Sequence, residues 1–164
     1  MIKILLSGEG PTDYGKKDSS GQWLDGPVQI YMHKMAAANE ITIVPFNRKN
    51  DATHVRVQKM PAGLQGHGKK AFLLALQAKH DGKDCAAFYV DADKETKLKG
   101  NNEHNCKKRY DGLKEEVFSG LNKIEGIKGI AVIPMKMIES WLMGDADSFN
   151  KAFGPAREKV QFPK

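Results

Sequence analysis

The chain has 164 residues, of which 40% are hydrophobic and 28% charged, and it carries a formal net charge of +6 with a pI of about 9.2. This composition excludes general disorder and predicts a single domain over residues 1–164. The basic balance favours a polyanionic partner. No apolar stretch approaches the ~18–20 residues of a membrane span and the two cysteines form no CxxC pair, so we expect a cytoplasmic protein without membrane or zinc-ribbon segments.

The first predicted element is a strand over residues 2–6, an apolar run that only Lys3 interrupts. A single acid, Glu9, follows this strand within the sequence GEGPTD. The two glycines that flank it permit a tight turn and leave its carboxylate free to point into a crevice. The alternative interpretation is an ordinary strand-to-helix turn with an acid on its surface.

A near match to the phosphate-binding loop GxxxxGK[ST] covers residues 10–17. Lys17 stands where that loop needs a hydroxyl, and Asp13 would repel the phosphates. A nucleotide-binding loop also needs a helix amino end aimed at the phosphate, and no helix pattern begins at Lys16. We therefore interpret the match as accidental and residues 16–27 as a loop.

The next predicted elements are a helix that begins at Pro27 and a strand over residues 40–46. The apolar face of that helix is expected to consist of Val28, Ile30, Tyr31, Met35 and Ala38. The polar stretch that follows leaves room for one short strand, over residues 54–60. An amphipathic helix is then predicted over residues 68–79.

Two lysines, Lys69 and Lys70, stand at the start of that helix, where the helix dipole disfavours positive charge. They are therefore candidates for binding an anionic ligand, with a solvated helix face as the alternative. Residues 86–93, AAFYVDAD, form an apolar run that ends on the carboxylates of Asp91 and Asp93. The run predicts a buried strand, whose carboxyl end is where open α/β sheets bind ligands. A solvated turn is the alternative for this acidic pair.

The last third of the chain continues the alternation. The polar residues 94–108 predict a loop, residues 109–124 a helix and residues 127–134 a strand. Glu139 then opens a predicted helix, and another follows over residues 147–154. The order of strands and helices predicts an α/β three-layer sandwich, with a mainly parallel four-stranded sheet flanked by helices.

Acidic side chains follow three of the predicted strands: Glu9, the pair Asp91 and Asp93, and Glu139. In a parallel sheet all of them lie at the same edge, where crowded carboxylates repel one another and one becomes protonated. Mg²⁺ or Mn²⁺ would remove this penalty, because hard divalent cations prefer oxygen ligands. Two such ions stabilise the attacking and leaving oxygens of a phosphodiester displacement.

The order of GEGPTD, then DAD, then IESW at residues 138–141 resembles the Toprim fold of topoisomerases, bacterial primases, recombination proteins and the overcoming-lysogenization-defect nucleases. The IESW segment also resembles short Toprim-like proteins of phage-defence or mobile-element systems. The resemblance implies that Asp91 and Asp93 bind Mg²⁺ and that Glu9 binds metal or transfers a proton. The chain departs from the pattern in its long loop after Glu9 and in Lys94. No tyrosine is placed as a topoisomerase nucleophile, which favours hydrolysis.

The leading hypothesis is a Mg²⁺-dependent phosphodiesterase that acts on nucleic acid and not at a membrane, a nuclease of a defence or mobile-element system. Glu9 or Glu139 would accept the proton of the attacking water. The backbone phosphates would be held by lysines near the site, without reading the sequence. These lysines are Lys16, Lys17, Lys69, Lys70 and Lys94.

Two other hypotheses remain open. The first is a non-catalytic Toprim-like subunit that binds a partner protein or nucleic acid within a larger assembly, such as a defence complex. The second is a phosphatase of the haloacid-dehalogenase type, whose signature is also DxD after a strand. That family expects the motif on the first strand, with Thr or Val four residues beyond the first Asp. Here the first strand carries Glu9, and Glu95 occupies the later position.

Overall fold

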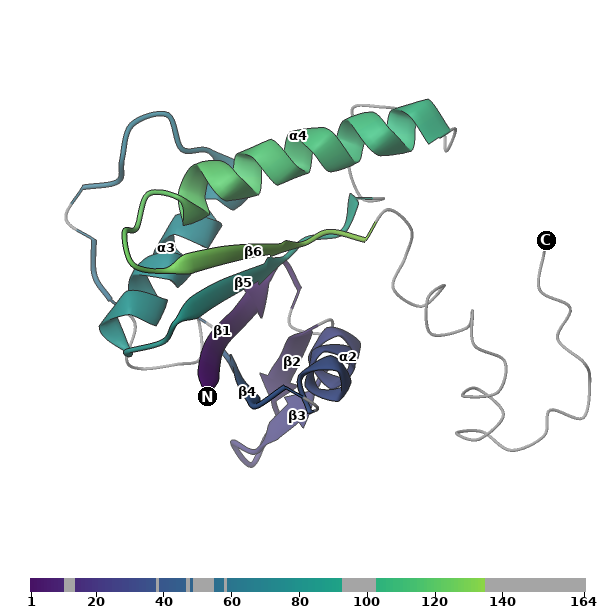
Figure 1. Ribbon diagram of the computed structural model, residues 1–164, viewed down its shortest axis with the longest axis vertical. Coiled ribbons are helices and arrows are strands. Elements are labelled where there is room, and N and C mark those ends of the chain that lie inside the picture. Colours follow the sequence, from purple (N-terminus) through teal and green to yellow (C-terminus); the bar gives the residue numbers. More distant parts are fainter. Residues whose placement is uncertain are drawn as a thin grey trace, which may run out of the picture.

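A four-stranded parallel sheet forms the centre of the protein (Figure 1). The computed structural model describes residues 1–10, 14–37, 39–46, 48, 55–57, 59–92 and 103–134. The strands lie in the order β4-β1-β5-β6, with bounds β1 Ile2–Gly8, β4 Ile41–Pro45, β5 Cys85–Tyr89 and β6 Lys128–Val132. Every pairing in this sheet is parallel. The sheet is flanked by the helices α2 Pro27–Ala36, α3 Gly66–His80 and α4 Glu103–Leu121.

The two central strands, β1 and β5, bury side chains on both faces of the sheet. Leu5 and Phe88 belong to a core that includes residues of α3 and α4, whereas Leu6 and Tyr89 belong to a second core with Val28 of α2. Successive side chains of a strand point to opposite faces, so neighbouring residues enter different cores. The predicted α/β three-layer sandwich with a parallel four-stranded sheet is therefore confirmed.

A β-hairpin precedes α2, although residues 16–27 were predicted to be a loop. It pairs β2, Gly15–Lys17, with β3, Trp23–Asp25, in antiparallel register. The carboxylate of Asp18 closes the turn, since its Oδ1 accepts hydrogen bonds from the Ser20 hydroxyl at 2.6 Å and from the Gln22 amide at 2.9 Å. The Ser20 hydroxyl bond is the main cause that lowers the pKa of Asp18 below its ordinary value.

The buried face of α2 differs from the predicted one. Its buried residues are Val28, Gln29 and Ala36, whereas Ile30, Tyr31 and Met35 are exposed. Gln29 is buried because its Oε1 accepts a hydrogen bond of 2.7 Å from the indole Nε1 of Trp23 in the hairpin. The hairpin therefore covers the polar side chain of Gln29, and the buried face of α2 is rotated relative to the predicted one. Ala38, the last residue of the predicted face, lies outside the described residues.

The second and third predicted helices are confirmed with shifted ends. α3 extends the predicted 68–79 by a few residues, and α4 begins at Glu103 rather than at 109, so residues 103–108 are helical and not loop. Leu113, Val117 and Leu121 are buried, as their spacing predicts. The described part of residues 54–60 contains no strand, and the helices predicted after residue 134 lie outside the described residues. None of the described helices has the length and apolar character needed to cross a membrane.

The helices α3 and α4 pack against each other at two glycines. A Cβ on Gly120 of α4 would overlap the carbonyl oxygen of Gly68 in α3 and would lie 2.8 Å from the amide nitrogen of Phe72. Next to this crossing, the Glu116 carboxylate accepts a hydrogen bond of 2.6 Å from the amide of His67 in the first turn of α3. That turn has no side-chain cap of its own from Gln65, so α4 supplies the anion that a helix amino end favours.

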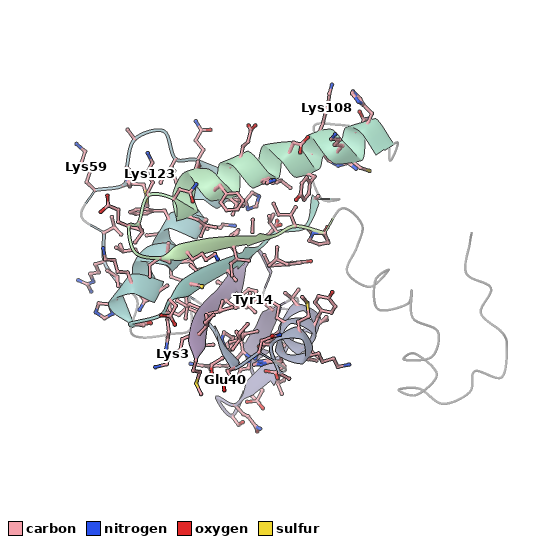
Figure 2. All side chains as sticks on the ribbon, in the orientation of Figure 1. Lys3, Tyr14, Glu40, Lys59, Lys108 and Lys123 are labelled. Carbon is pink, nitrogen blue, oxygen red and sulfur yellow. The ribbon has the colours of Figure 1, made fainter. Side chains whose placement is uncertain are left out.

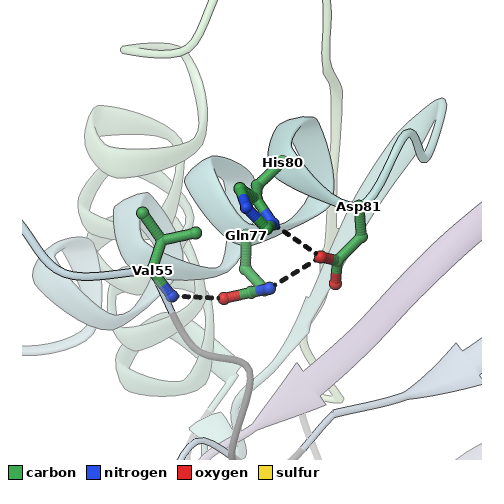
Figure 3. Close-up of polar contacts among 4 residues, drawn as sticks. All are labelled: Val55, Gln77, His80 and Asp81. Carbon is green, nitrogen blue, oxygen red and sulfur yellow. Dashed lines mark hydrogen bonds and ion pairs between the residues drawn. The ribbon is translucent and has the colours of Figure 1, made fainter.

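A buried glutamine on α3 fixes the segment that precedes the helix (Figure 3). The Oε1 of Gln77 accepts a hydrogen bond of 2.7 Å from the Val55 amide, and its Nε2 donates one of 2.8 Å to Asp81. The same Asp81 oxygen lies 2.9 Å from Nδ1 of His80. Gln77 is fully buried, so its side chain ties residue 55 to the carboxyl end of α3 from the interior of the protein.

We expect the substitution Gln77→Met to lower the free energy of unfolding by about 1–3 kcal/mol, because it leaves the Val55 amide without its partner. Methionine has a similar length, so the packing changes little. Denaturant titration followed by circular dichroism measures the difference. The control Gln65→Met changes an exposed residue whose side chain makes no cap hydrogen bond, and it should stay within about 0.5 kcal/mol of the unsubstituted protein. Equal stabilities for the two variants would contradict the assigned role of Gln77.

Candidate functional site

Glu9 and Asp91 follow the carboxyl ends of two adjacent parallel strands, β1 and β5, and therefore lie at the same edge of the sheet. Gly8 of β1 is opposite Tyr89 of β5, and the amide of Glu9 donates a hydrogen bond of 3.0 Å to the Tyr89 carbonyl. Glu9 therefore follows the last pair of the ladder directly, and Asp91 comes two residues after Tyr89. Asp91 is 5% exposed, whereas Glu9 is exposed. One acid is thus fixed in the interior of the edge and the other faces solvent.

Glycine is required at the end of β1 because the two strands come very close there. A Cβ on Gly8 would lie 2.8 Å from the carbonyl oxygen of Tyr89 and 2.9 Å from its Cβ. Any larger residue would push β1 away from β5 immediately before the two acids. The glycine that precedes Glu9 in the sequence therefore sets the spacing of the strands that carry the acids.

The neighbouring strand β6 extends along the same edge. The amide of Val90 donates to the Val132 carbonyl, and the amide of Ala92 donates to the Pro134 carbonyl, both at 3.1 Å. The pairing of β5 with β6 thus continues past the end of both strands as far as the residue that follows Asp91. Asp93, Lys94 and Glu139, which the sequence also assigns to the site, lie outside the described residues.

A buried arginine that was not among the predicted site residues lies at this edge. Arg109 of α4 is 4% exposed, and its Nε donates a hydrogen bond of 3.0 Å to the carbonyl of Ala92. Another guanidinium nitrogen lies 3.2 Å from Sγ of Cys106. Its burial could have been inferred from helical periodicity. Position 109 lies four residues before Leu113, which lies four before Val117, so all three share the buried face of the helix.

Exposed lysines lie on three elements around the sheet. Lys16 and Lys17 are on β2, and Lys69 and Lys70 are in the first turns of α3, and all four are exposed. α3 and α4 each connect two parallel strands and run from the carboxyl edge of the sheet back to its amino edge. Both helices therefore begin on the side of Glu9 and Asp91. The amino end of α4 extends beyond the sheet (Figure 1) and carries the exposed Lys107 and Lys108, the latter labelled in Figure 2.

The donor set suits a hard divalent cation, since it contains two carboxylates, one of them on the buried Asp91. Within the described ranges, no group of three or more His, Cys, Asp and Glu side chains is close enough to hold a metal ion. Glu9 and Asp91 are the two predicted metal ligands that these ranges include, and the fold brings them to one edge. Asp93 and Glu139 would have to complete the site.

The remaining cysteine, Cys85, opens β5 and belongs to the core. Burial is the main cause that raises the pKa of its thiol, with a smaller contribution from Asp84.

No family model matches this chain, and no curated protein or solved structure matches it either.

Proposed function

We propose that this chain is a Mg²⁺-dependent phosphodiesterase that cleaves nucleic acid at the carboxyl edge of its sheet. The observation that supports this proposal best is the position of Glu9 and Asp91 after adjacent parallel strands, next to the hydrogen bond of 3.0 Å between the Glu9 amide and the Tyr89 carbonyl. Acids that are far apart in the sequence thereby share one edge, as a common metal site requires.

The two acids are suited to different roles. Asp91 is 5% exposed and follows the buried strand β5, so its carboxylate is a well-positioned metal ligand. Glu9 is exposed at the end of β1 and is therefore accessible to an attacking water, whose proton it would accept. Bound Mg²⁺ or Mn²⁺ would supply charge stabilisation for the phosphate oxygens. In this proposal Asp93 and Glu139 contribute the remaining carboxylates.

The substrate class is proposed from the lysines. A nucleic acid backbone presents regularly spaced phosphates, and lysine contacts hold it without reading its sequence. Lys69 and Lys70 on α3 and Lys107 and Lys108 on α4 are exposed near the helix ends that begin on the acidic side of the sheet. Positive charge is unfavourable at these helix ends, so binding to an anionic ligand would account for it. Lys16, Lys17 and Lys94 would extend the contact.

The segments GEGPTD, DAD and IESW are the basis for proposing a Toprim-like nuclease of the phage-defence or mobile-element type. In such a setting the enzyme would work in the cytoplasm, alone or with a partner protein. A cleavage activity that depends on metal distinguishes this proposal from a binding subunit, which would retain nucleic acid without cutting it.

We expect the purified chain to bind Mn²⁺ and Mg²⁺ at millimolar or lower concentration and to cleave labelled DNA or RNA only when metal is present. Isothermal titration calorimetry measures the binding, and gel analysis of single- and double-stranded substrates measures the cleavage. Addition of a chelator in excess should stop the reaction, and renewed metal should restore it. Absence of heat at millimolar metal, with the protein folded by circular dichroism, would refute the metal site.

A further inference from the structure

We infer that Arg109 is a positioning residue of the acidic edge: its guanidinium fixes the Ala92 peptide, which directly follows Asp91, and so holds the Asp91 carboxylate in place. This inference rests on the proposed function for its consequence, the binding of metal. Its structural part, a guanidinium held on the Ala92 carbonyl, can be tested without any metal. The test of the held guanidinium and the test of metal binding can therefore give different results.

The peptide units around Ala92 are held from two sides. The Ala92 amide donates a hydrogen bond of 3.1 Å to the Pro134 carbonyl beyond β6, and the Ala92 carbonyl accepts one of 3.0 Å from Nε of Arg109 in α4. Ala92 itself is 1% exposed and packs in the core that α3 and α4 share with the sheet. The residue between the two acids is thus fixed by a strand and a helix at once.

Burial of this arginine is difficult to explain by stability alone. A guanidinium that is 4% exposed loses most of its hydration, which costs free energy unless its donors are paired. An apolar residue at position 109 would continue the stripe of Leu113 and Val117 without this cost. Arginine offers what an apolar residue lacks, a planar fork of donors that can hold the Ala92 carbonyl, and a permanent positive charge. Both properties suit the task of ordering an acidic turn.

The decisive variant is Arg109→Lys, which retains the charge but loses the planar fork and the Nε donor. We expect its affinity for Mn²⁺ to fall about 10–100-fold, the range found when an outer-shell partner of a metal ligand is removed. The control is Lys123→Met, which removes a charge from an exposed position just after α4 and should leave the affinity for Mn²⁺ within about threefold. Calorimetry measures both variants, after circular dichroism has shown that they are folded.

A variant without the charge separates positioning from simple electrostatics. If Arg109 acted only as a positive charge that repels the metal, Arg109→Met would bind Mn²⁺ more tightly than the unsubstituted protein. If it positions the acidic turn, both Arg109→Met and Arg109→Lys bind more weakly. Unchanged affinity in Arg109→Lys, or tighter binding in Arg109→Met, would overturn the inference.

The unsubstituted protein provides a measurement that does not depend on the folding of any variant. In metal-free solution the Nε–H proton of Arg109 should exchange with water at least about tenfold more slowly than that of the exposed Arg56, because it is buried and hydrogen-bonded. Addition of Mn²⁺ should then broaden the Arg109 resonance selectively. Rapid exchange would disprove the held guanidinium, and slow exchange without any Mn²⁺ effect or binding would leave it standing while rejecting the proposed metal site.

Discussion

Replacement of Asp91 by asparagine is expected to lower the rate of metal-dependent cleavage more than about 100-fold. Loss of an outer-shell partner of a metal ligand already costs roughly 10–100-fold, so loss of the ligand itself should cost at least as much. Asparagine has the shape of aspartate, and the side chain is 5% exposed, so the packing around it should be retained. Initial rates on a labelled substrate, at saturating metal for the unsubstituted protein, measure the effect.

The control for this variant lies at the opposite end of the same strand, β5. Asp84 directly precedes β5 at its amino end, where its Oδ2 accepts a hydrogen bond of 2.7 Å from the Lys3 amide, and asparagine can accept the same bond. Asp84→Asn should therefore cleave at nearly the rate of the unsubstituted protein. Glu9→Gln should be impaired like Asp91→Asn, whereas Glu125→Gln, an exposed change before β6 begins, should not. Full activity of Asp91→Asn or Glu9→Gln would refute the proposed site.

The packing of α3 against α4 should be very sensitive to one added methyl group. Gly120→Ala places a Cβ onto the Gly68 carbonyl oxygen and 2.8 Å from the Phe72 amide nitrogen, so the two helices must separate. Overpacking of this kind costs about 1–3 kcal/mol of unfolding free energy. Backbone atoms cannot rotate away as a flexible side chain would, so we expect the upper part of this range.

The same glycine-to-alanine substitution at another position of α4 should raise the stability of the protein instead of lowering it. A Cβ on Gly112 meets no heavy atom of the described residues within 4 Å, and alanine is the better helix former by about 1 kcal/mol. Gly112→Ala should therefore raise the midpoint of thermal unfolding, while Gly120→Ala lowers it. Calorimetric or circular-dichroism melts of the two variants measure the difference. A stabilised Gly120→Ala would show that α3 and α4 do not meet at these glycines.

The sheet could be predicted from the sequence because its signals are local. The runs of β1 and β5 are apolar without interruption in their centres, which is typical of strands buried on both faces, and both faces are in fact covered. The acids that end these runs could be placed at one edge from the parallel order alone. Glu9 and Asp91 lie at that edge.

The elements that the sequence did not reveal depend on contacts between distant residues. The β2-β3 hairpin has no alternating pattern, because much of its stabilisation comes from the turn around Asp18 and from the bond of Trp23 to Gln29. That bond also buries a polar residue of α2, which an amphipathic pattern assigns to solvent. The first turns of α4 lack apolar periodicity because they extend beyond the sheet (Figure 1), where the described residues offer them no core.

Arg109 illustrates the same limit at the site. Arg109 stands at the start of the predicted helix, where a charged residue is ordinarily solvated. Its burial depends on the Ala92 carbonyl, which lies in a part of the chain distant in sequence from α4. Its phase with Leu113 and Val117 was visible, but phase alone indicates burial and not the partner. The role of such a residue becomes apparent only when the strand end and the helix are seen together.

The strand order also constrains how the molecule assembles during synthesis. β1 is made first, yet Ile2 pairs with Ile41 and Ile4 pairs with Cys85, so both sides of this strand stay open until much later parts of the chain exist. Contacts of such long sequence separation slow folding and leave an apolar strand available for mispairing. A nascent chain that has not yet emerged past Tyr89 should therefore depend on the ribosome surface or on chaperones to keep β1 from aggregating.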